Sequence, residues 1–141
     1  MGFRLATWNI NSVRLRIGLV QKLLKEHQPD ILALQETKCP QGQFPSKPLT
    51  DMGYIHIAEF GQKGYHGVAI VSRIPSHTQH SSDSCSKCDC RHVSVKFDGK
   101  DPFTLQNLYV PAGGDEPDVK INEKFAHKLS FLEEMEQWSK E

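Results

Sequence analysis

Three apolar stretches of the chain are each followed by a polar side chain that could do chemistry. Asn9 follows LATW, Glu36 follows ILALQ, and Tyr109 follows LQNL. In α/β sheets the carboxyl ends of strands are where ligands bind, because the loops there hold side chains on a rigid platform. A carboxylate, an amide and a phenol on one such edge indicate a site for a hard cation and an oxyanion. Taken singly, each residue is also typical of an ordinary polar loop.

Glu36 is the candidate metal ligand of this set. Mg²⁺ prefers oxygen ligands and takes one or two carboxylates, with water and substrate phosphate as the remaining ligands. We therefore expect Glu36 to bind Mg²⁺, with Asn9 or Asn11 as a neutral oxygen ligand beside it.

The elements that would position these residues begin with an α/β unit. Residues 3–9 alternate in polarity and predict a strand, and residues 31–35 are nearly all apolar and predict a second, central strand. Between them, apolar residues at helical spacing predict a helix that has Ser12 as its cap and runs to about Gln28, where Pro29 ends it. The fold class is therefore α/β.

The rest of the chain predicts more strands and one long helix. Residues 39–53 are rich in Pro, Gly, Ser and Gln, and predict a loop with one helical turn, while residues 75–90 form a polar segment between strands. The close spacing of the later strands favours antiparallel neighbours. We expect these strands at residues 54–59, 68–72, 92–97 and 103–109, and the helix at residues 122–140.

The composition is that of a folded, water-soluble protein. The 141 residues include 17 Lys and Arg against 17 Asp and Glu, and 38% are hydrophobic, which argues against disorder. No apolar run approaches the ~20 residues of a transmembrane helix, and no secretory signal is recognisable, so we expect a cytoplasmic protein with no membrane partner. The first 45 residues are basic and residues 115–141 are acidic. This would suit contact of one face with a polyanion, or simply two solvated surfaces.

Four sequence blocks resemble the successive signatures of the exonuclease III family, the DNA-repair branch of the endonuclease/exonuclease/phosphatase superfamily. The blocks are LATWNINSVRLR, PDILALQETKC, GQKGYHGVAIVSR and NLYVPAGG, and they occur in the family's order. The resemblance implies a four-layered α/β sandwich, in which two packed mixed β-sheets are flanked by helices. It also implies a phosphodiesterase that uses Mg²⁺ or Mn²⁺ to cut double-stranded DNA at abasic sites and to digest it from 3′ ends.

The resemblance also implies roles for single residues. Glu36 matches the family's metal-binding glutamate, and Asn9 matches the asparagine that lines the same site. Tyr109 matches the active-site tyrosine, which helps to position the attacked phosphate. Four further positions match residues that approach the DNA backbone or support the site in relatives: Arg14, Gly64, Tyr65 and Arg91.

The family's later motifs do not occur in these 141 residues. Relatives continue with a Gly-Asp block whose aspartate activates the attacking water, and end with a Ser-Asp-His triplet whose histidine contacts the scissile phosphate. We therefore expect residues 1–141 to be roughly the first half of the domain and nearly inactive alone. The activity would belong to a full-length parent, or a separate chain would supply the second half. Two alternatives are an inactive remnant that binds DNA weakly and a superfamily hydrolase of another phosphoester.

Three cysteines lie close together in the segment that precedes Arg91. Cys85, Cys88 and Cys90 could bind Zn²⁺ together with Cys39 or His92. The one-residue spacing is tight for a zinc site, and reduced thiols in a surface loop are the simpler interpretation. The exonuclease III family does not show these cysteines as a motif, so the sequence departs from the family pattern just before Arg91.

Overall fold

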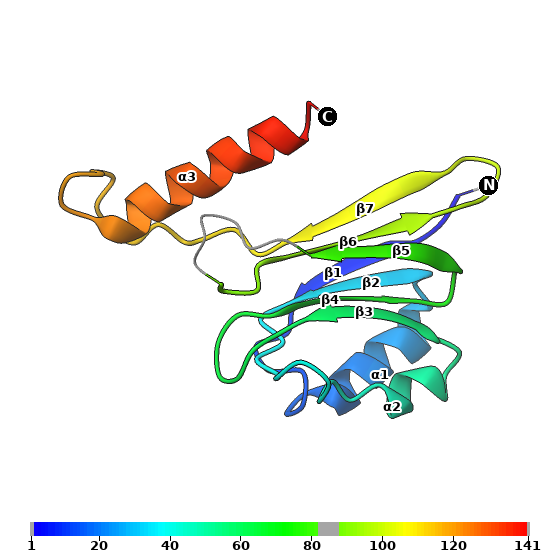
Figure 1. The fold of residues 1–141 in the computed structure, drawn as a ribbon. Helices are drawn as coiled ribbons and strands as arrows, with labels where there is room; N and C mark the ends of the chain where they lie inside the picture. The colour runs from blue at the N-terminus through cyan, green and yellow to red at the C-terminus, as the bar shows by residue number, and fades with distance from the viewer. Residues whose placement is uncertain (1, 82–87, 141) are drawn as a thin grey trace. The chain divides into compact units, whose positions relative to one another are not determined.

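The computed structural model describes residues 2–81 and 88–140 (Figure 1). The chain divides into two compact units, the first comprising Met1–Ser82 with Asp89–Tyr109 and the second comprising Asp83–Cys88 with Val110–Glu141. Over the described residues, the first unit contains two β-sheets and two helices, and the second contains one helix. All of the site residues expected from the sequence belong to the first unit.

Four strands form the first sheet, in the order β1-β2-β4-β3. β1 (Leu5–Asn9) runs parallel to β2 (Ile31–Gln35), whereas β4 (Val68–Ser72) pairs antiparallel with both β2 and β3 (His56–Phe60). The sheet is therefore mixed. β2 and β4 are buried over nearly their whole length. For β2 this confirms the central position predicted from its nearly continuous apolar sequence.

The second sheet is formed by β5 (Ser76–Ser81), β6 (His92–Phe97) and β7 (Phe103–Leu108), which pair antiparallel in that order. It packs on the first sheet, with β6 against β3 and β4, and β7 against β2 and β4. The alternate residues Val93, Val95 and Phe97 of β6 are buried in the core between the sheets, as the period of two in a strand requires.

A helix layer covers the other face of the first sheet. Helices α1 (Ile17–His27) and α2 (Lys47–Thr50) lie below that sheet in Figure 1. Val20 and Leu24 of α1 and Leu49 of α2 are fully buried in the core on this side. The first unit is thus a stack of one helix layer and two sheets, each pair joined by an apolar core.

The second unit contains α3 (Glu123–Trp138). Asn122 caps this helix, because its side-chain oxygen accepts hydrogen bonds from the backbone N–H groups of Lys124 and Phe125. Its side-chain nitrogen donates to the carbonyls of Gly113 and Glu116, which ties the preceding loop to the helix start. Among residues 2–81 and 88–140, no helix has the length and apolar character needed to cross a membrane.

The structure confirms the α/β class and the two sheets, and it differs from the sequence expectation at two places. Ser12 does not cap α1, which begins at Ile17; its backbone N–H instead donates to the carbonyl of Glu36 at 2.8 Å, so residues 10–13 continue alongside the end of β2. The expectation of a Ser12 cap was wrong because this pairing holds the chain in a non-helical course. β5 lies within the polar segment 75–90, where its sequence SHTQHS shows no apolar alternation.

Candidate active site

Asn9, Glu36 and Tyr109 lie at the same end of the two packed sheets. Asn9 is the last residue of β1 and pairs with Gln35, the last residue of β2. Glu36 therefore leaves the first sheet directly beside Asn9. Tyr109 follows β7, and its backbone N–H donates to the carbonyl of Arg91 at 2.8 Å, which extends the second sheet by one pair. The three strand ends that the sequence indicated are thus brought together by the stacking of the sheets.

The side chain of Glu36 is the centre of the site. The hydroxyl of Tyr109 donates to Glu36 Oε1 at 2.5 Å. This hydrogen bond, and next a hydrogen bond from the side chain of Asn9, lower the pKa of the Glu36 carboxyl, and the charge of Lys38 acts in the same direction. The Glu36 side chain is 21% exposed, so an ionised carboxylate is presented to solvent.

The loop that carries Glu36 is held in an uncommon conformation. Glu36 and Lys38 have φ angles of +53° and +49°, in the left-handed region that non-glycine residues seldom adopt. Backbone hydrogen bonds to the glycine-rich turn hold the loop in place. The N–H of Thr37 donates to Gly67 O at 3.1 Å, and that of Lys38 donates to His66 O at 2.9 Å. Such backbone strain is typical of functional sites, where the surrounding structure compensates for it.

The oxygens near Glu36 are suited to a hard cation. The ammonium of Lys38 lies 2.6 Å from Asn11 Oδ1 and 3.6 Å from Glu36 Oε2, so these two oxygens already face one positive group. A carboxylate and amide oxygens are the ligands that Mg²⁺ and Mn²⁺ take in proteins. Within the described part of the chain no cluster of three or more His, Cys, Asp or Glu side chains is arranged to hold a metal. The donor set therefore fits an ion that keeps water or phosphate as its other ligands.

A basic hollow adjoins the carboxylate. It measures about 420 Å³, and its wall includes Arg14, Arg16, Lys38, Lys63 and Gly64. Four cationic side chains around one hollow give it a positive potential that is suited to an anion.

Two of the residues expected to bind DNA flank this hollow and keep some freedom. Within residues 2–81 and 88–140, the hydrogen bonds of Arg14 are long, 3.3 Å to Gln43 Oε1 and 3.4 Å to Lys38 O, and an anion could replace these neutral acceptors. Tyr65, on the glycine-rich turn that follows Gly64, is 69% exposed. Both side chains are therefore able to meet a large ligand.

Arg91 is placed differently from the other residues expected to bind DNA. Its guanidinium lies over the ring of Tyr109, 4.9 Å from the ring centre, and its Nε donates to the carboxylate of Asp89. Its Nη2 lies 3.2 Å from Nε2 of His66. Because arginine only donates, His66 Nε2 accepts this bond and the imidazole is neutral. Burial, and secondarily the charge of Arg91, lower the pKa of His66, which agrees with a neutral ring.

Asn107 is a buried residue that the sequence analysis did not single out. Its Nδ2 donates to the carbonyls of Leu34 at 3.0 Å and Ala69 at 2.8 Å, so it joins β7 to both central strands of the first sheet. Its Oδ1 accepts from Nε2 of Gln35, which also donates to Thr7 Oγ1. The available signal was a polar residue at an inward position of an otherwise apolar strand face. Lys38 and Asp89 carry no comparable signal, because charged residues in loops are common.

Three of the four cysteines lie among the described residues: Cys39 and Cys90 are buried and Cys88 is exposed. Cys85, the remaining member of the possible zinc pattern, lies outside the described residues. Zinc binding by this pattern stays a prediction.

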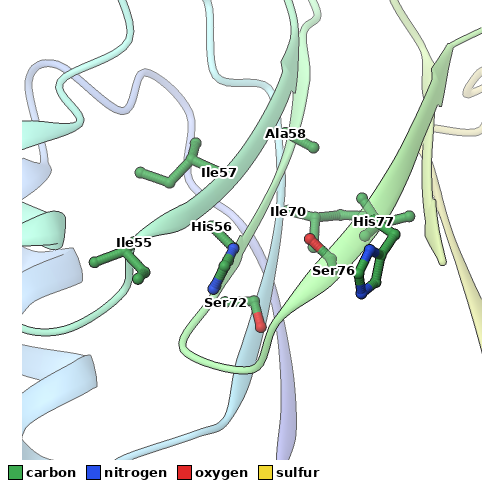
Figure 2. A pocket seen from close by; sticks show the side chains of 9 residues that line it. Ile55, His56, Ile57, Ala58, Ile70, Ser72, Ser76 and His77 are labelled. Atoms are coloured by element: carbon green, nitrogen blue, oxygen red, sulfur yellow. The ribbon is translucent and has the colours of Figure 1, made fainter. Parts of the chain in front are cut away.

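A second hollow lies away from the site. Its volume is about 280 Å³. Figure 2 shows His56, Ser72 and His77 among the side chains that line it. It adjoins the end of β4 at Ser72, which is opposite to the end that pairs near Glu36. Ser72 Oγ donates to a backbone carbonyl and His77 pairs with Asp98 at 3.0 Å, so these polar groups are engaged within the protein.

Comparison with known proteins places this geometry in a family. The chain is 28% identical over 136 residues to exodeoxyribonuclease III from Haemophilus influenzae, covering 94% of the chain and 49% of that relative. An AP endonuclease structure from Archaeoglobus fulgidus matches with a TM-score of 0.81 and 35% identity over 95% of this chain and 49% of that chain.

A further solved structure is that of the 3′ phosphatase NExo from Neisseria bound to a product DNA hairpin. It matches with a TM-score of 0.76 and 35% identity, covering 96% of this chain and 53% of that chain. The chain therefore spans about half the length of these relatives. Residues 6–140 match the endonuclease/exonuclease/phosphatase family, to which the chain belongs.

Proposed function

We propose that this chain supplies the metal-binding and phosphate-positioning half of a DNA-repair phosphodiesterase. The activity would be that of a 3′→5′ exodeoxyribonuclease and abasic-site endonuclease on double-stranded DNA, with Mg²⁺ or Mn²⁺ as cofactor. The observation that carries the proposal is the contact across the two sheets, in which the hydroxyl of Tyr109 donates to Glu36 beside Asn9. Relatives whose names denote DNA-repair nucleases support the same function.

In this mechanism Glu36 and Asn11 would hold the metal ion, and Asn9 would orient the Glu36 carboxylate by its hydrogen bond. When bound, the ion supplies positive charge that offsets the charge of the phosphodiester under attack. Burial, and then the hydrogen bond to Glu36, raise the pKa of Tyr109, so its hydroxyl keeps its proton at neutral pH and remains a donor. Its single proton is now donated to the Glu36 carboxylate, and with a metal ion on that carboxylate the hydroxyl would instead donate to a phosphate oxygen and stabilise the charge that develops there.

The basic hollow would bind neighbouring phosphates of the DNA backbone. Arg14 lines it together with Gly64, and the exposed ring of Tyr65 would contact the DNA beside it. Contacts of this kind fix the register of the protein on DNA without reading sequence, so binding should weaken steeply with salt.

The second half of the site would come from residues beyond these 141 or from a separate chain. In the described part of the chain, β1 pairs only with β2 and β7 pairs only with β6, so each sheet has an edge strand near the site. Leu5 of β1 is 48% exposed, and Phe3 just before this strand is exposed on one side and stacks on Phe103. Unpaired edges with apolar side chains favour addition of further strands. Alone, the chain would be nearly inactive, because groups that act together in a site lose most of the rate when some are missing.

The first test measures Mn²⁺ binding to the chain through the electron paramagnetic resonance signal of the ion. We expect Glu36→Gln to weaken Mn²⁺ binding at least tenfold and Glu26→Gln, a matched change at an exposed helical glutamate, to leave it unchanged. Equal affinity in both variants would remove Glu36 from the metal site.

The second test measures cleavage of an abasic-site duplex by the chain alone and after co-expression with the second half of a relative. The expected result is negligible cleavage alone and Mg²⁺-dependent cleavage by the pair, which Glu36→Gln abolishes. Strong cleavage by the chain alone would contradict the missing-half proposal. DNA binding without cleavage in either case would favour the inactive remnant, and turnover of p-nitrophenyl phosphate without DNA cleavage would favour another phosphoesterase.

A further inference from the structure

Arg91 and Tyr109 form one structural unit at the end of the second sheet. Arg91 precedes β6 and Tyr109 follows β7, and the backbone N–H of Tyr109 donates to Arg91 O at 2.8 Å. The side chain of Arg91 then turns back over its neighbour. Its Nη1 donates to Tyr109 O at 3.2 Å while the guanidinium covers the face of the aromatic ring. Arginine is well suited to this position, because its planar group stacks on aromatic faces.

Two further residues fix the guanidinium from its other sides. Nε donates to the carboxylate of Asp89, and Nη2 donates to Nε2 of His66. The side chains of Arg91 and Asp89 are each 10% exposed. All three guanidinium nitrogens therefore have protein acceptors, and His66 in turn lies beside Tyr109, with the ring centres 5.8 Å apart.

We infer that Arg91 is a positioning residue that holds Tyr109 against Glu36, and that it is not a contact to DNA phosphate. The ring of Tyr109 is held at its face by Arg91 and at its hydroxyl by Glu36, so its orientation is determined from both ends. To bind a phosphate, Arg91 would have to give up its hydrogen bond and ion pair with the buried carboxylate of Asp89, which is costly. The inference rests on the proposed function only in that it assigns Tyr109 to the site.

The salt dependence of DNA binding separates the two roles. Each phosphate contact contributes about 0.9 to the slope of log Kobs against log[salt] on duplex DNA. We expect Arg14→Met to reduce this slope by about 0.9 and Arg91→Met to leave it unchanged, when binding to a fluorescent abasic-site duplex is measured in EDTA. An equal reduction for Arg91→Met would overturn the inference.

A second measurement needs no DNA and reports on Tyr109 directly. In ring-labelled tyrosine NMR spectra, with Tyr109→Phe for assignment, Arg91→Met should shift the Tyr109 resonances and leave those of Tyr54 in place. Tyr54 is a suitable internal control because its hydroxyl donates to Pro29 O in the other core. Arg14→Met should shift neither. Unchanged Tyr109 resonances in Arg91→Met would also overturn the inference.

A conservative variant covers the case in which Arg91→Met does not fold. Arg91→Lys keeps the charge but cannot reproduce three directed hydrogen bonds, so it should still shift the Tyr109 resonances and leave the salt slope unchanged. If no DNA binding is detected for any variant, the proposed DNA-binding function fails, whereas the NMR measurement still decides the role of Arg91.

Discussion

Asn107 joins the two sheets directly beneath the candidate site, and its replacement by aspartate is the most informative perturbation. The amide nitrogen faces two carbonyl oxygens, those of Leu34 and Ala69, and carbonyls only accept hydrogen bonds. In Asn107→Asp an oxygen takes the place of this nitrogen. At neutral pH a carboxylate would then lie against two acceptors in a site where the native residue is 3% exposed.

The expected cost follows from the three hydrogen bonds of Asn107. A typical hydrogen bond contributes a net ~1 kcal/mol, so Asn107→Ala should lower the free energy of unfolding by about 3 kcal/mol. Domains of this size are stable by ~5–15 kcal/mol, so this loss is large. Asn107→Asp should cost more than the alanine variant at neutral pH, because it adds repulsion and the desolvation of a charge.

The pH dependence gives the sharper prediction. A buried carboxyl without a cation has a native-state pKa above its value in the unfolded chain. The destabilisation of Asn107→Asp is therefore smallest below the unfolded-state pKa, where the acid is protonated in both states and its O–H can donate to one carbonyl. It grows as the pH rises toward the native-state pKa. Acid should thus partly restore this variant relative to wild type.

Urea unfolding at pH 4.5 and pH 8, followed by tryptophan fluorescence, measures this difference. Thr104→Asp is the matched control, because Thr104 is exposed on the same strand. Its difference from wild type should be small and nearly independent of pH. A penalty for Asn107→Asp that is the same at both pH values, or a loss below 1 kcal/mol for Asn107→Ala, would refute the role given to this amide.

Two further predictions concern the frame of the first unit. A hydrogen bond from the backbone N–H of Arg4, and then that from Arg73, lower the pKa of Asp30. Ionised Asp30 therefore stabilises the folded state at pH values above its ordinary pKa. This contribution to the free energy of unfolding is lost as the pH falls through the lowered native-state pKa. Asp30→Asn should cost about 1–2 kcal/mol at pH 7 and less in acid, and a pH-independent cost in urea unfolding would contradict this. Gly67→Ala should destabilise by about 3 kcal/mol, because its Cβ would lie 2.2 Å from a hydroxyl oxygen at a φ of +88°. Gly42→Ala, at a φ of +82° with no atom within 4 Å, isolates the backbone contribution, and equal thermal shifts in the two variants would refute the steric reasoning.

Much of the secondary structure of the two sheets follows from the local pattern of apolar residues in the sequence. The apolar run of β2 predicts a central strand, and the sequence also predicts strands at residues 68–72 and 92–97, which are β4 and β6. β5 could not be predicted in this way, because SHTQHS carries no hydrophobic alternation. Its strand forms through pairing with β6. The conformation of Ser12 could not be predicted from the local sequence either, because its backbone hydrogen bond to Glu36 O outweighs its local preference for a helix start.

The amino-acid sequence alone determined the α/β class, the strands that lead to Asn9, Glu36 and Tyr109, and the oxygen chemistry that these side chains share. Only the tertiary structure decided what each of them touches. Tyr109 and Glu36 are 73 positions apart, and their 2.5 Å contact depends on the packing of one sheet on the other. The same packing places Arg91 over Tyr109. Such contacts depend on distances between strands that no local pattern encodes.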